Sequence, residues 1–296
     1  MDISGDVKRF DGAVTLLPYG LREKLRELNR EERAEAEEFR LRRGKAVSVV
    51  FPGGERSLGG QEVSQGDLDF LLEVASAASV HTVRSKLSSG YITARGGYRV
   101  GFAGSAALEG GRVSAVSNIS SAAVRIAREK RGIAEGVFFP EDFRSALIIS
   151  PPGGGKTTLL RDAVRLLSSG KGGLRVSLCD ERGEIAAMCG GAPQLDVGDR
   201  TDVLDGWPKA EAITAALRAL SPEVIALDEI TSPEDCDAVL AASHCGVGLL
   251  ATAHGLSLED LGKRPVYKRL LENGVFRELV TITTVGGRRL YGKSRL

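Results

Sequence analysis

The sequence is poor in the residues and runs that mark several classes of protein. It has four cysteines, none in a Cys-x-x-Cys pair, and three histidines among 296 residues. This set supplies no structural zinc motif, and we expect the cysteines to be small core residues in a reduced, cytoplasmic protein. The opening residues, MDISGDVKRFDG, lack the apolar core of a secretory signal. No run approaches the roughly 18 apolar residues that a membrane span requires.

Excess charge and aromatic residues are also lacking. The chain has 40 basic and 39 acidic residues, so the totals indicate neither a polyanion-coating protein nor an acidic disordered tail. Aromatic residues make up 5%, which leaves few platforms for stacking nucleic-acid bases. Glycine is abundant instead: 37 residues, about an eighth of the chain, against a usual value of ~7%. Many backbone positions are therefore expected to adopt conformations, or to approach other groups, in ways that a side chain would prevent.

The length favours two domains of ~150 residues each. The first part has mixed patterns that predict a small α+β domain over residues 1–134. Its expected elements are one or two helices over Leu21–Arg43, a strand at 45–51, a helix over Asp67–Ala78, a hairpin at 90–104 about Gly96 and Gly97, and a helix over Ser120–Arg131.

From about residue 135 the pattern changes to apolar strands that alternate with helices. The predicted strands are 146–150, 174–179, 224–227 and 248–253, followed by a closing hairpin about Gly286 and Gly287. Such alternation predicts an α/β domain over 135–296, with a parallel sheet covered by helices on both faces. Ligands of such sheets bind beyond the carboxyl ends of the strands.

The strongest motif is SPPGGGKTT at 150–158, placed directly between a predicted strand and a predicted helix. Its glycines leave room for backbone N–H groups to surround phosphate oxygens, Lys156 would reach the β and γ phosphates, and the Thr157 hydroxyl would ligate Mg²⁺. Ser150 stands where the P-loop pattern has glycine. We expect the nucleotide to be bound by Pro152, Gly153, Gly154, Gly155, Lys156, Thr157 and Thr158.

A second motif, VIALDE at 224–229, ends a predicted strand with two carboxylates. Asp228 would hold Mg²⁺ through water, and Glu229 would position the attacking water. The two acids would lie beside the glycine loop if their strands were neighbours. The two motifs together predict hydrolysis of a nucleoside triphosphate, with Mg²⁺ as cofactor.

Two further strand ends point to the same edge of the sheet. Asp180, Glu181 and Glu184 follow one strand, and they would either organise magnesium-bound waters or cap the next helix. His254 follows another strand, where its imidazole could sense the γ phosphate or hold the water. We place His254 and Glu181 among the catalytic residues.

The stretch at 217–255 resembles the corresponding block of secretion-type RecA-like ATPases, the motors of type II and type IV secretion and of pili. The run from DERGEIAAMCGG onward and the upstream GYITARGGYRVGFAG resemble, more closely, the stage III sporulation protein AA family of endospore-forming bacteria. The resemblance implies a RecA-like fold and ATP rather than GTP. It also implies action in the mother cell, peripheral to a membrane channel complex that links mother cell and forespore.

Secretion motors usually carry an arginine two residues after the catalytic glutamate, where this chain has Thr231. A supplied guanidinium is worth roughly 10³ to 10⁵ in the rate of phosphoryl transfer. The candidates are Arg99, Arg182, Arg200 and Arg218, of which we place Arg200 in the site. Because a neighbouring subunit could donate this group, we expect a homo-oligomeric ring, by analogy a hexamer, with little activity as a monomer.

Two other functions fit the same loop. The basic end GGRRLYGKSRL and the group Arg84, Lys86, Arg95 and Arg99 favour a nucleic-acid motor or binding module, although the scarcity of aromatics weighs against it. A small-molecule phosphotransferase usually needs an arginine-bearing lid, and no such segment is evident between 158 and 290.

Overall fold

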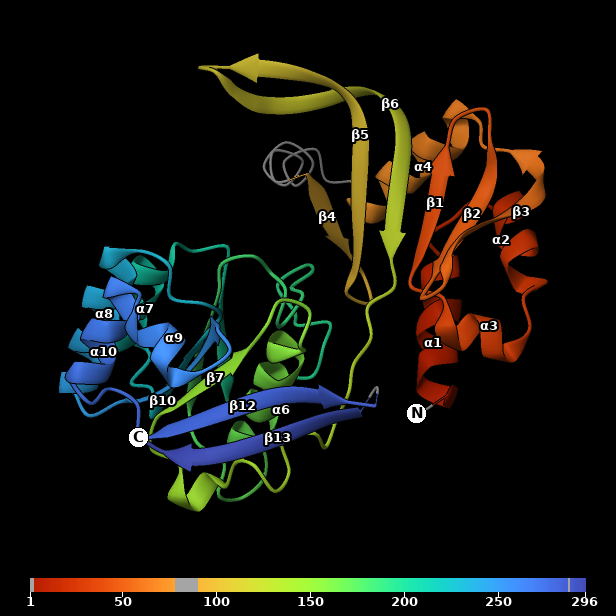
Figure 1. Ribbon diagram of the computed structural model, residues 1–296. Coiled ribbons are helices and arrows are strands. Elements are labelled where there is room, and N and C mark those ends of the chain that lie inside the picture. Colours follow the sequence, from red (N-terminus) through yellow and green to blue (C-terminus); the bar gives the residue numbers. More distant parts are fainter. Residues whose placement is uncertain (1–2, 78–89, 287) are drawn as a thin grey trace. The chain divides into compact units, whose positions relative to one another are not determined.

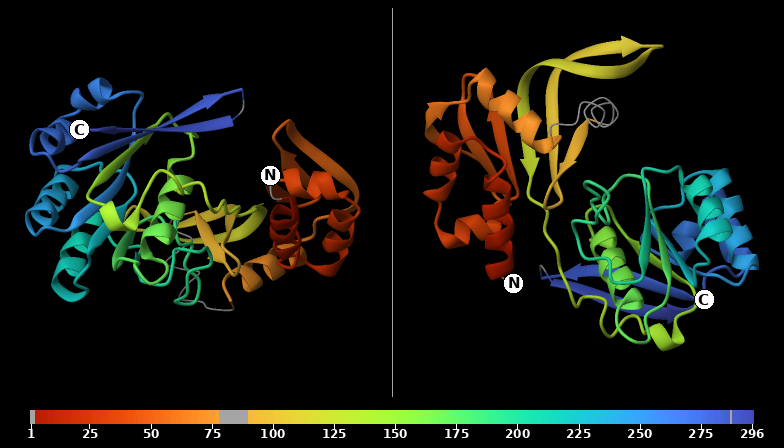
Figure 2. Two further views of the ribbon diagram at one scale, coloured as in Figure 1. Left: turned by 90° about the horizontal axis from the view of Figure 1, so that it is seen from below. Right: turned by 180° about the vertical axis from the view of Figure 1, so that it is seen from behind.

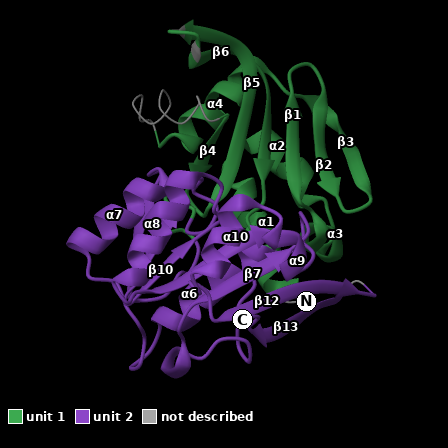
Figure 3. Ribbon diagram, turned by 60° about the vertical axis from the view of Figure 1, so that its left-hand side comes forward, with its two compact units in different colours: residues 1–128, 187–194 green, residues 129–186, 195–296 purple. Residues whose placement is uncertain are grey.

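The computed structural model describes residues 3–77, 90–286 and 288–296. The chain forms two compact units (Figure 3). One contains Met1–Arg128 and Ala187–Gln194, and the other contains Glu129–Ala186 and Leu195–Leu296. The domain boundary that the sequence predicts between residues 134 and 135 remains a prediction. No helix among the described residues is long and apolar enough to cross a membrane.

The first unit is an antiparallel six-stranded sheet with helices against one face (Figure 1). Residues from α1, α2 and α4 pack on one side of the sheet, in a core with Phe10, Leu21, Leu68 and Phe39 at its centre. The strand order is β3-β2-β1-β6-β5-β4. The elements are α1 (Ile3–Val14), α2 (Tyr19–Arg26), α3 (Arg30–Glu35), β1 (Glu38–Arg42), β2 (Ala46–Phe51), β3 (Gly54–Glu62), α4 (Gln65–Ala75), β4 (Tyr91–Ala94), β5 (Tyr98–Glu109) and β6 (Arg112–Arg125).

Two helix predictions in this unit were wrong. Of the helix expected over Ser120–Arg131, the part up to Arg125 is the end of β6, which pairs with β1 on one side and β5 on the other, and residues 126–131 form neither helix nor strand. Its alanines favour a helix, but Ala122 and Val124 are buried at alternate positions, so sheet pairing overrides local propensity. The last part of Leu21–Arg43 is likewise strand β1, in which Phe39 and Leu41 are buried. The hairpin at 90–104 is confirmed, and Ala78, Arg84 and Lys86 lie outside the described residues.

The second unit confirms the predicted parallel sheet. Its strand order is β13-β12-β7-β11-β10-β8-β9, and only β13 is antiparallel to its neighbour. The elements are a 3-10 turn η1 (Pro140–Asp142), β7 (Ala146–Ser150), α6 (Lys156–Ser168), β8 (Val176–Asp180), β9 (Thr201–Asp205), α7 (Lys209–Ala219), β10 (Val224–Leu227), α8 (Pro233–His244), β11 (Gly248–His254), α9 (Leu258–Gly262), α10 (Pro265–Glu272), β12 (Glu278–Val285) and β13 (Arg288–Arg295).

Helices cover both faces of this sheet. Residues of α7, α8 and α10 share a core with alternate residues of the central strands, while α6 lies against the opposite face (Figures 1 and 2). All five residues of β7 are buried, as a strand covered on both sides requires. Edge strand β9, of sequence TDVLD, was not predicted, because it is short and mostly half-exposed.

The cysteines meet the expectation of core residues only in part. Cys179 and Cys236 are buried, but Cys189 is half-buried and Cys245 is exposed. Burial raises the pKa of the Cys179 thiol to about 12, so this thiol stays protonated at neutral pH.

Strand order decides what meets at the carboxyl edge of the sheet. The β7 and β10 strands are not neighbours, because β11 lies between them. The register pairs His254 with Ser150 and Leu227 with Ala251. Asp228 is therefore level with Thr252, and β11 supplies the groups that connect the glycine loop to the acidic pair.

Candidate active site

The loop between β7 and α6 has a backbone that glycine adopts most readily. Gly153 and Gly155 have φ angles of 72° and 96°, in the left-handed region. A Cβ on Gly154 would lie 2.8 Å from the Ser150 Cβ and 3.0 Å from the Pro151 carbonyl oxygen. Ser150 itself adopts the turn and donates its hydroxyl to the Pro151 carbonyl oxygen at 2.9 Å. Serine thus replaces the first glycine of the motif without opening the loop.

This loop leads into the start of α6, where anions bind well. Gly155 occupies the N-cap position, and within the described chain no side chain caps the first turn. The N–H groups of that turn and the positive end of the helix dipole favour a bound anion. Pro152 is exposed on the loop, and Thr158 is half-buried in the first turn.

The Lys156 ammonium group is buried among neutral acceptors. Its Nζ donates to the carbonyl oxygens of Ser150 at 3.2 Å and Pro151 at 3.4 Å, and it lies 2.7 Å from Nδ1 of His254. Burial lowers the pKa of Lys156, and the charges of Asp228 and Glu229 oppose that shift. A phosphate would be a stronger partner for this cation than the two carbonyls and the imidazole.

Asp228 accepts hydrogen bonds from two threonines. Thr157 Oγ1 donates to its Oδ2 at 3.2 Å, and Thr252 Oγ1 donates to its Oδ1. The Thr157 hydroxyl gives its proton to Asp228, so its lone pairs remain available to a cation. These hard oxygen donors fit Mg²⁺, which Thr157 would ligate directly and Asp228 would hold through water. Among the described residues, no group of three or more His, Cys, Asp or Glu could hold a metal without such help.

Glu229 is held in an unusual conformation directly after Asp228. Its φ angle is 28°, which is strained for a residue with a side chain. Its backbone N–H donates to Thr252 Oγ1 at 3.1 Å, and its Oε2 lies 3.5 Å from Nε2 of His254. Because an ammonium group can only donate, Nδ1 of His254 accepts from Lys156, which leaves the imidazole proton on Nε2 facing Glu229. His254 thus stands between the cation and the carboxylate.

The acidic run after β8 has a different arrangement. Asp180 is buried and accepts three backbone N–H bonds, from Glu184, Ile185 and Ala186, at 2.9 to 3.0 Å. Burial raises its pKa, and these hydrogen bonds oppose the shift. Glu181 forms an ion pair with the buried Lys209. Asp180 therefore shapes the following loop, and the Glu181 carboxylate is paired with the Lys209 ammonium.

Arg200 does not lie with the other predicted residues. It immediately precedes β9, so it lies at the amino-terminal edge of the sheet, opposite to the glycine loop. Its Nη1 donates to the Gly173 carbonyl oxygen at 2.6 Å. The sequence missed this placement because the strand that follows Arg200 was not recognised. Within its own chain, Arg200 stabilises a loop at the far edge.

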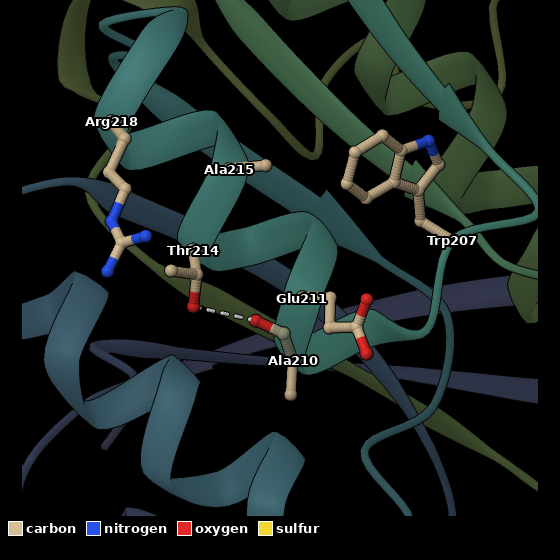
Figure 4. A pocket seen from close by; sticks show the side chains of 6 residues that line it. All are labelled: Trp207, Ala210, Glu211, Thr214, Ala215 and Arg218. Carbon is tan, nitrogen blue, oxygen red and sulfur yellow. Dashed lines mark hydrogen bonds between the residues drawn. The ribbon is translucent and has the colours of Figure 1, made fainter.

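The other arginines considered are spread over the fold. Arg99 belongs to β5 of the first unit, where its guanidinium lies 3.8 Å from the centroid of the Tyr91 ring. Arg218 lies in the last turn of α7 and borders a surface pocket of about 400 Å³ (Figure 4). The other lining residues are Trp207, Ala210, Glu211, Thr214 and Ala215, and the Thr214 hydroxyl donates to the Ala210 carbonyl at 2.9 Å.

Sequence reasoning missed three residues around the site. Thr252, fully buried, connects Asp228 to the Glu229 backbone, and it was detectable as the hydroxyl residue in the apolar run GLLATA. Tyr267 accepts a hydrogen bond from the Ile230 N–H at 3.2 Å and carries no sequence signal for this role. Arg289 lies against the glycine loop, whereas the sequence showed it only as part of a basic end.

Comparison with known proteins identifies related sequences. The chain matches the family described as sporulation stage III, protein AA, over residues 8–290. It is 40% identical over 278 residues to stage III sporulation protein AA of Bacillus subtilis, covering 92% of this chain and 90% of that protein. It is also 32% identical over 157 residues to the uncharacterized protein ycf45 of Cyanidium caldarium, covering 52% and 46% of the two chains.

Solved structures with the same fold are ATPases. The Legionella pneumophila ATPase DotB aligns with a TM-score of 0.59 and 17% identity, over 93% of this chain and 80% of that one. The pilus retraction motor PilT, solved with bound ADP, aligns with a TM-score of 0.62 and 17% identity, over 88% and 79%. At this identity the likeness shows the fold alone, which is the RecA-like fold of secretion ATPases. The sequence comparisons are more specific: the chain belongs to the sporulation stage III protein AA family.

Proposed function

We propose that the chain is a Mg²⁺-dependent ATPase. The observation that supports this best is the assembly of two distant motifs at one sheet edge. Thr157, from the glycine loop, lies 3.2 Å from Asp228, and the Lys156 ammonium is joined through His254 to Glu229. A cation, an anion-binding helix start and a carboxylate pair are the groups that phosphoryl transfer to water requires.

The residues would divide the work as follows. The glycine loop and Lys156 bind the β and γ phosphates, and the ammonium exchanges its carbonyl partners for phosphate oxygens. Glu229 orients the attacking water and accepts its proton, while the Nε2–H of His254 restrains the carboxylate. A bound Mg²⁺, held by Thr157 and by Asp228 through water, would neutralise charge on the phosphates. We propose that Glu181 takes part in catalysis at this edge of the sheet only when its ion pair with Lys209 is broken.

The physiological part of the proposal is a motor. Family membership and the shared fold support ATP-driven work on a membrane-associated complex between mother cell and forespore, performed from the cytoplasmic side of the mother cell. We propose that the chain works as a homo-oligomeric ring, with a hexamer as the expected size. The secretion-motor fold favours this assembly. Arg200 is remote from the loop of its own chain, so an arginine from a neighbouring subunit could supply the charge that stabilises the transition state.

The nucleic-acid alternative loses part of its support in the structure. Within the basic end, Lys293 pairs with Glu278 at 2.9 Å and also donates to the Val137 carbonyl oxygen. Arg289 lies against the glycine loop. The ion pair of Lys293 with Glu278 therefore removes one cation from the basic surface that a phosphate backbone would need.

The experiment compares ATP binding and turnover by the wild type, Lys156→Ala and Glu229→Gln across protein concentrations. The lysine variant should lose nucleotide binding, whereas the glutamine variant should bind ATP and fail to hydrolyse it. Specific activity should rise with protein concentration if a ring is the active form. Equal turnover by all three proteins would overturn the ATPase proposal. Strong stimulation by DNA or RNA, lost steeply with added salt, would favour the alternative.

A further inference from the structure

Arg289 of β13 reaches the phosphate-binding loop of its own chain. A Cβ on Gly155 would lie 2.7 Å from both Cζ and Nη1 of Arg289, so the guanidinium rests directly on this glycine. Its Nη2 donates to the Gly153 carbonyl oxygen at 3.5 Å, which is long for a hydrogen bond. Gly155 therefore has two reasons to lack a side chain: its φ angle of 96° and the arginine above it.

The charge of Arg289 has little compensation at this place. Among the described residues no carboxylate lies within 4.0 Å of its guanidinium, which has five N–H donors to satisfy. Lys293, four residues later on the same side of β13, pairs with Glu278. Tyr291, between them, is half-buried. On this face of the strand, Lys293 is thus paired with a carboxylate, while Arg289 lies against the loop.

A cation at this location is unfavourable without an anion. The start of α6 carries the positive end of the helix dipole, which repels a positive side chain. The buried ammonium of Lys156 adds a second positive charge in the same loop. A phosphate chain on the loop would convert these repulsions into attractions, and a guanidinium fork suits phosphate oxygens.

We propose that Arg289 binds the phosphate chain of the nucleotide from the C-terminal hairpin of the same chain. The inference rests on the proposed ATPase function and deepens it. It adds an arginine in cis that does not depend on a neighbouring subunit. Nucleotide binding would then replace the long bond to Gly153 by charge-assisted bonds to phosphate.

The test measures equilibrium binding of ATP and ADP to Arg289→Ala, Arg289→Lys and the control Arg288→Ala. Both arginines are exposed and they are adjacent in sequence, but Arg288 lies on the other side of β13. We expect the dissociation constant of Arg289→Ala to rise about tenfold to hundredfold, because one or two charge-assisted bonds are lost. The dissociation constant of Arg289→Lys should lie between those of Arg289→Ala and the wild type. The dissociation constant of Arg288→Ala should stay within about twofold of the wild-type value.

Thermal unfolding separates a ligand contact from a structural role. Without nucleotide, Arg289→Ala should unfold at the wild-type temperature or slightly above it, since a repulsion has been removed. At an ATP concentration that saturates the wild type, the unfolding temperature of Arg289→Ala should rise by less than that of the wild type. A lower unfolding temperature without nucleotide, combined with unchanged affinity, would overturn the inference.

The two proposals fail in different ways. If the wild type binds ATP, Lys156→Ala does not, and Arg289→Ala binds as the wild type does, the inference is wrong and the ATPase proposal stands. If the wild type binds no ATP, both are wrong.

Discussion

Thr252 links the acidic pair to the central strand, and its replacement by valine tests the geometry of the site. Valine keeps the shape of the side chain but removes the hydroxyl, which is fully buried. That hydroxyl donates to Asp228 and accepts from the Glu229 N–H at 3.1 Å. Thr252→Val therefore removes a hydrogen bond to a charged group, worth about 1.5 to 3 kcal/mol, and leaves one N–H without its acceptor.

Water can replace part of this loss, because Asp228 and Glu229 are only half-buried. We expect the free energy of unfolding to fall by about 2.5 kcal/mol, at the low end of the sum of the two terms. The strained backbone of Glu229, with its φ angle of 28°, would lose the contact that holds its N–H. A displacement that costs about 1.4 kcal/mol in the transition state slows turnover tenfold.

Three assays separate the effects: steady-state hydrolysis measures turnover, equilibrium binding measures the affinity for ATP, and urea unfolding measures stability. Turnover by Thr252→Val should fall at least about tenfold while ATP still binds. Thr252→Ser is the matched control, since it keeps the hydroxyl and loses one methyl group, worth about 1 kcal/mol. Turnover by the valine variant within twofold of the serine variant would refute a positioning role for Thr252.

Two further substitutions probe other contacts. Tyr267→Phe removes the acceptor of the buried Ile230 N–H, so the free energy of unfolding should fall by about 1 to 3 kcal/mol; the change should exceed that of the exposed Tyr19→Phe, and equal values would contradict it. Hydrogen bonds from Arg42, then Ser48, lower the pKa of Glu55 from 4.5 to about 2, so the Arg42–Glu55 pair stabilises the fold above pH 4.5 and loses that effect as the pH falls toward 2. Because solvent screens this exposed pair, Glu55→Gln should cost at most about 1 kcal/mol at pH 7 and nothing near pH 2 in urea unfolding; a cost independent of pH would reject the ion pair as its source.

Local pattern was sufficient where a segment is buried on both sides or where chemistry restricts the residue type. The four strands predicted after residue 135 and the hairpin about Gly286 are present. The glycine loop follows a strand and precedes a helix as predicted. These features depend on contacts within a few residues, so the sequence carries them directly.

Local pattern failed where pairing partners decide the structure. The end of β6 has helix-forming alanines, but it lies between β1 and β5, and ladder hydrogen bonds on both sides outweigh a propensity of a few tenths of a kcal/mol per residue. The short edge strand β9 contains no buried apolar run, so the sequence pattern did not predict it. The position of Arg200, which directly precedes β9, was therefore not predicted either. Both errors concern contacts between segments distant in the sequence.

The amino-acid sequence by itself determined the residue types of the site: three glycines, a lysine with adjacent threonines, and a strand that ends in two acids. Only the tertiary structure decided which of these groups meet. The order of the strands inserts β11 between the two motifs, and so brings Thr252 and His254 between the loop and the acidic pair. Closure of the C-terminal hairpin likewise brings Arg289 onto Gly155. Strand order and hairpin packing arise from burial summed over the whole sheet, which no short stretch of residues records.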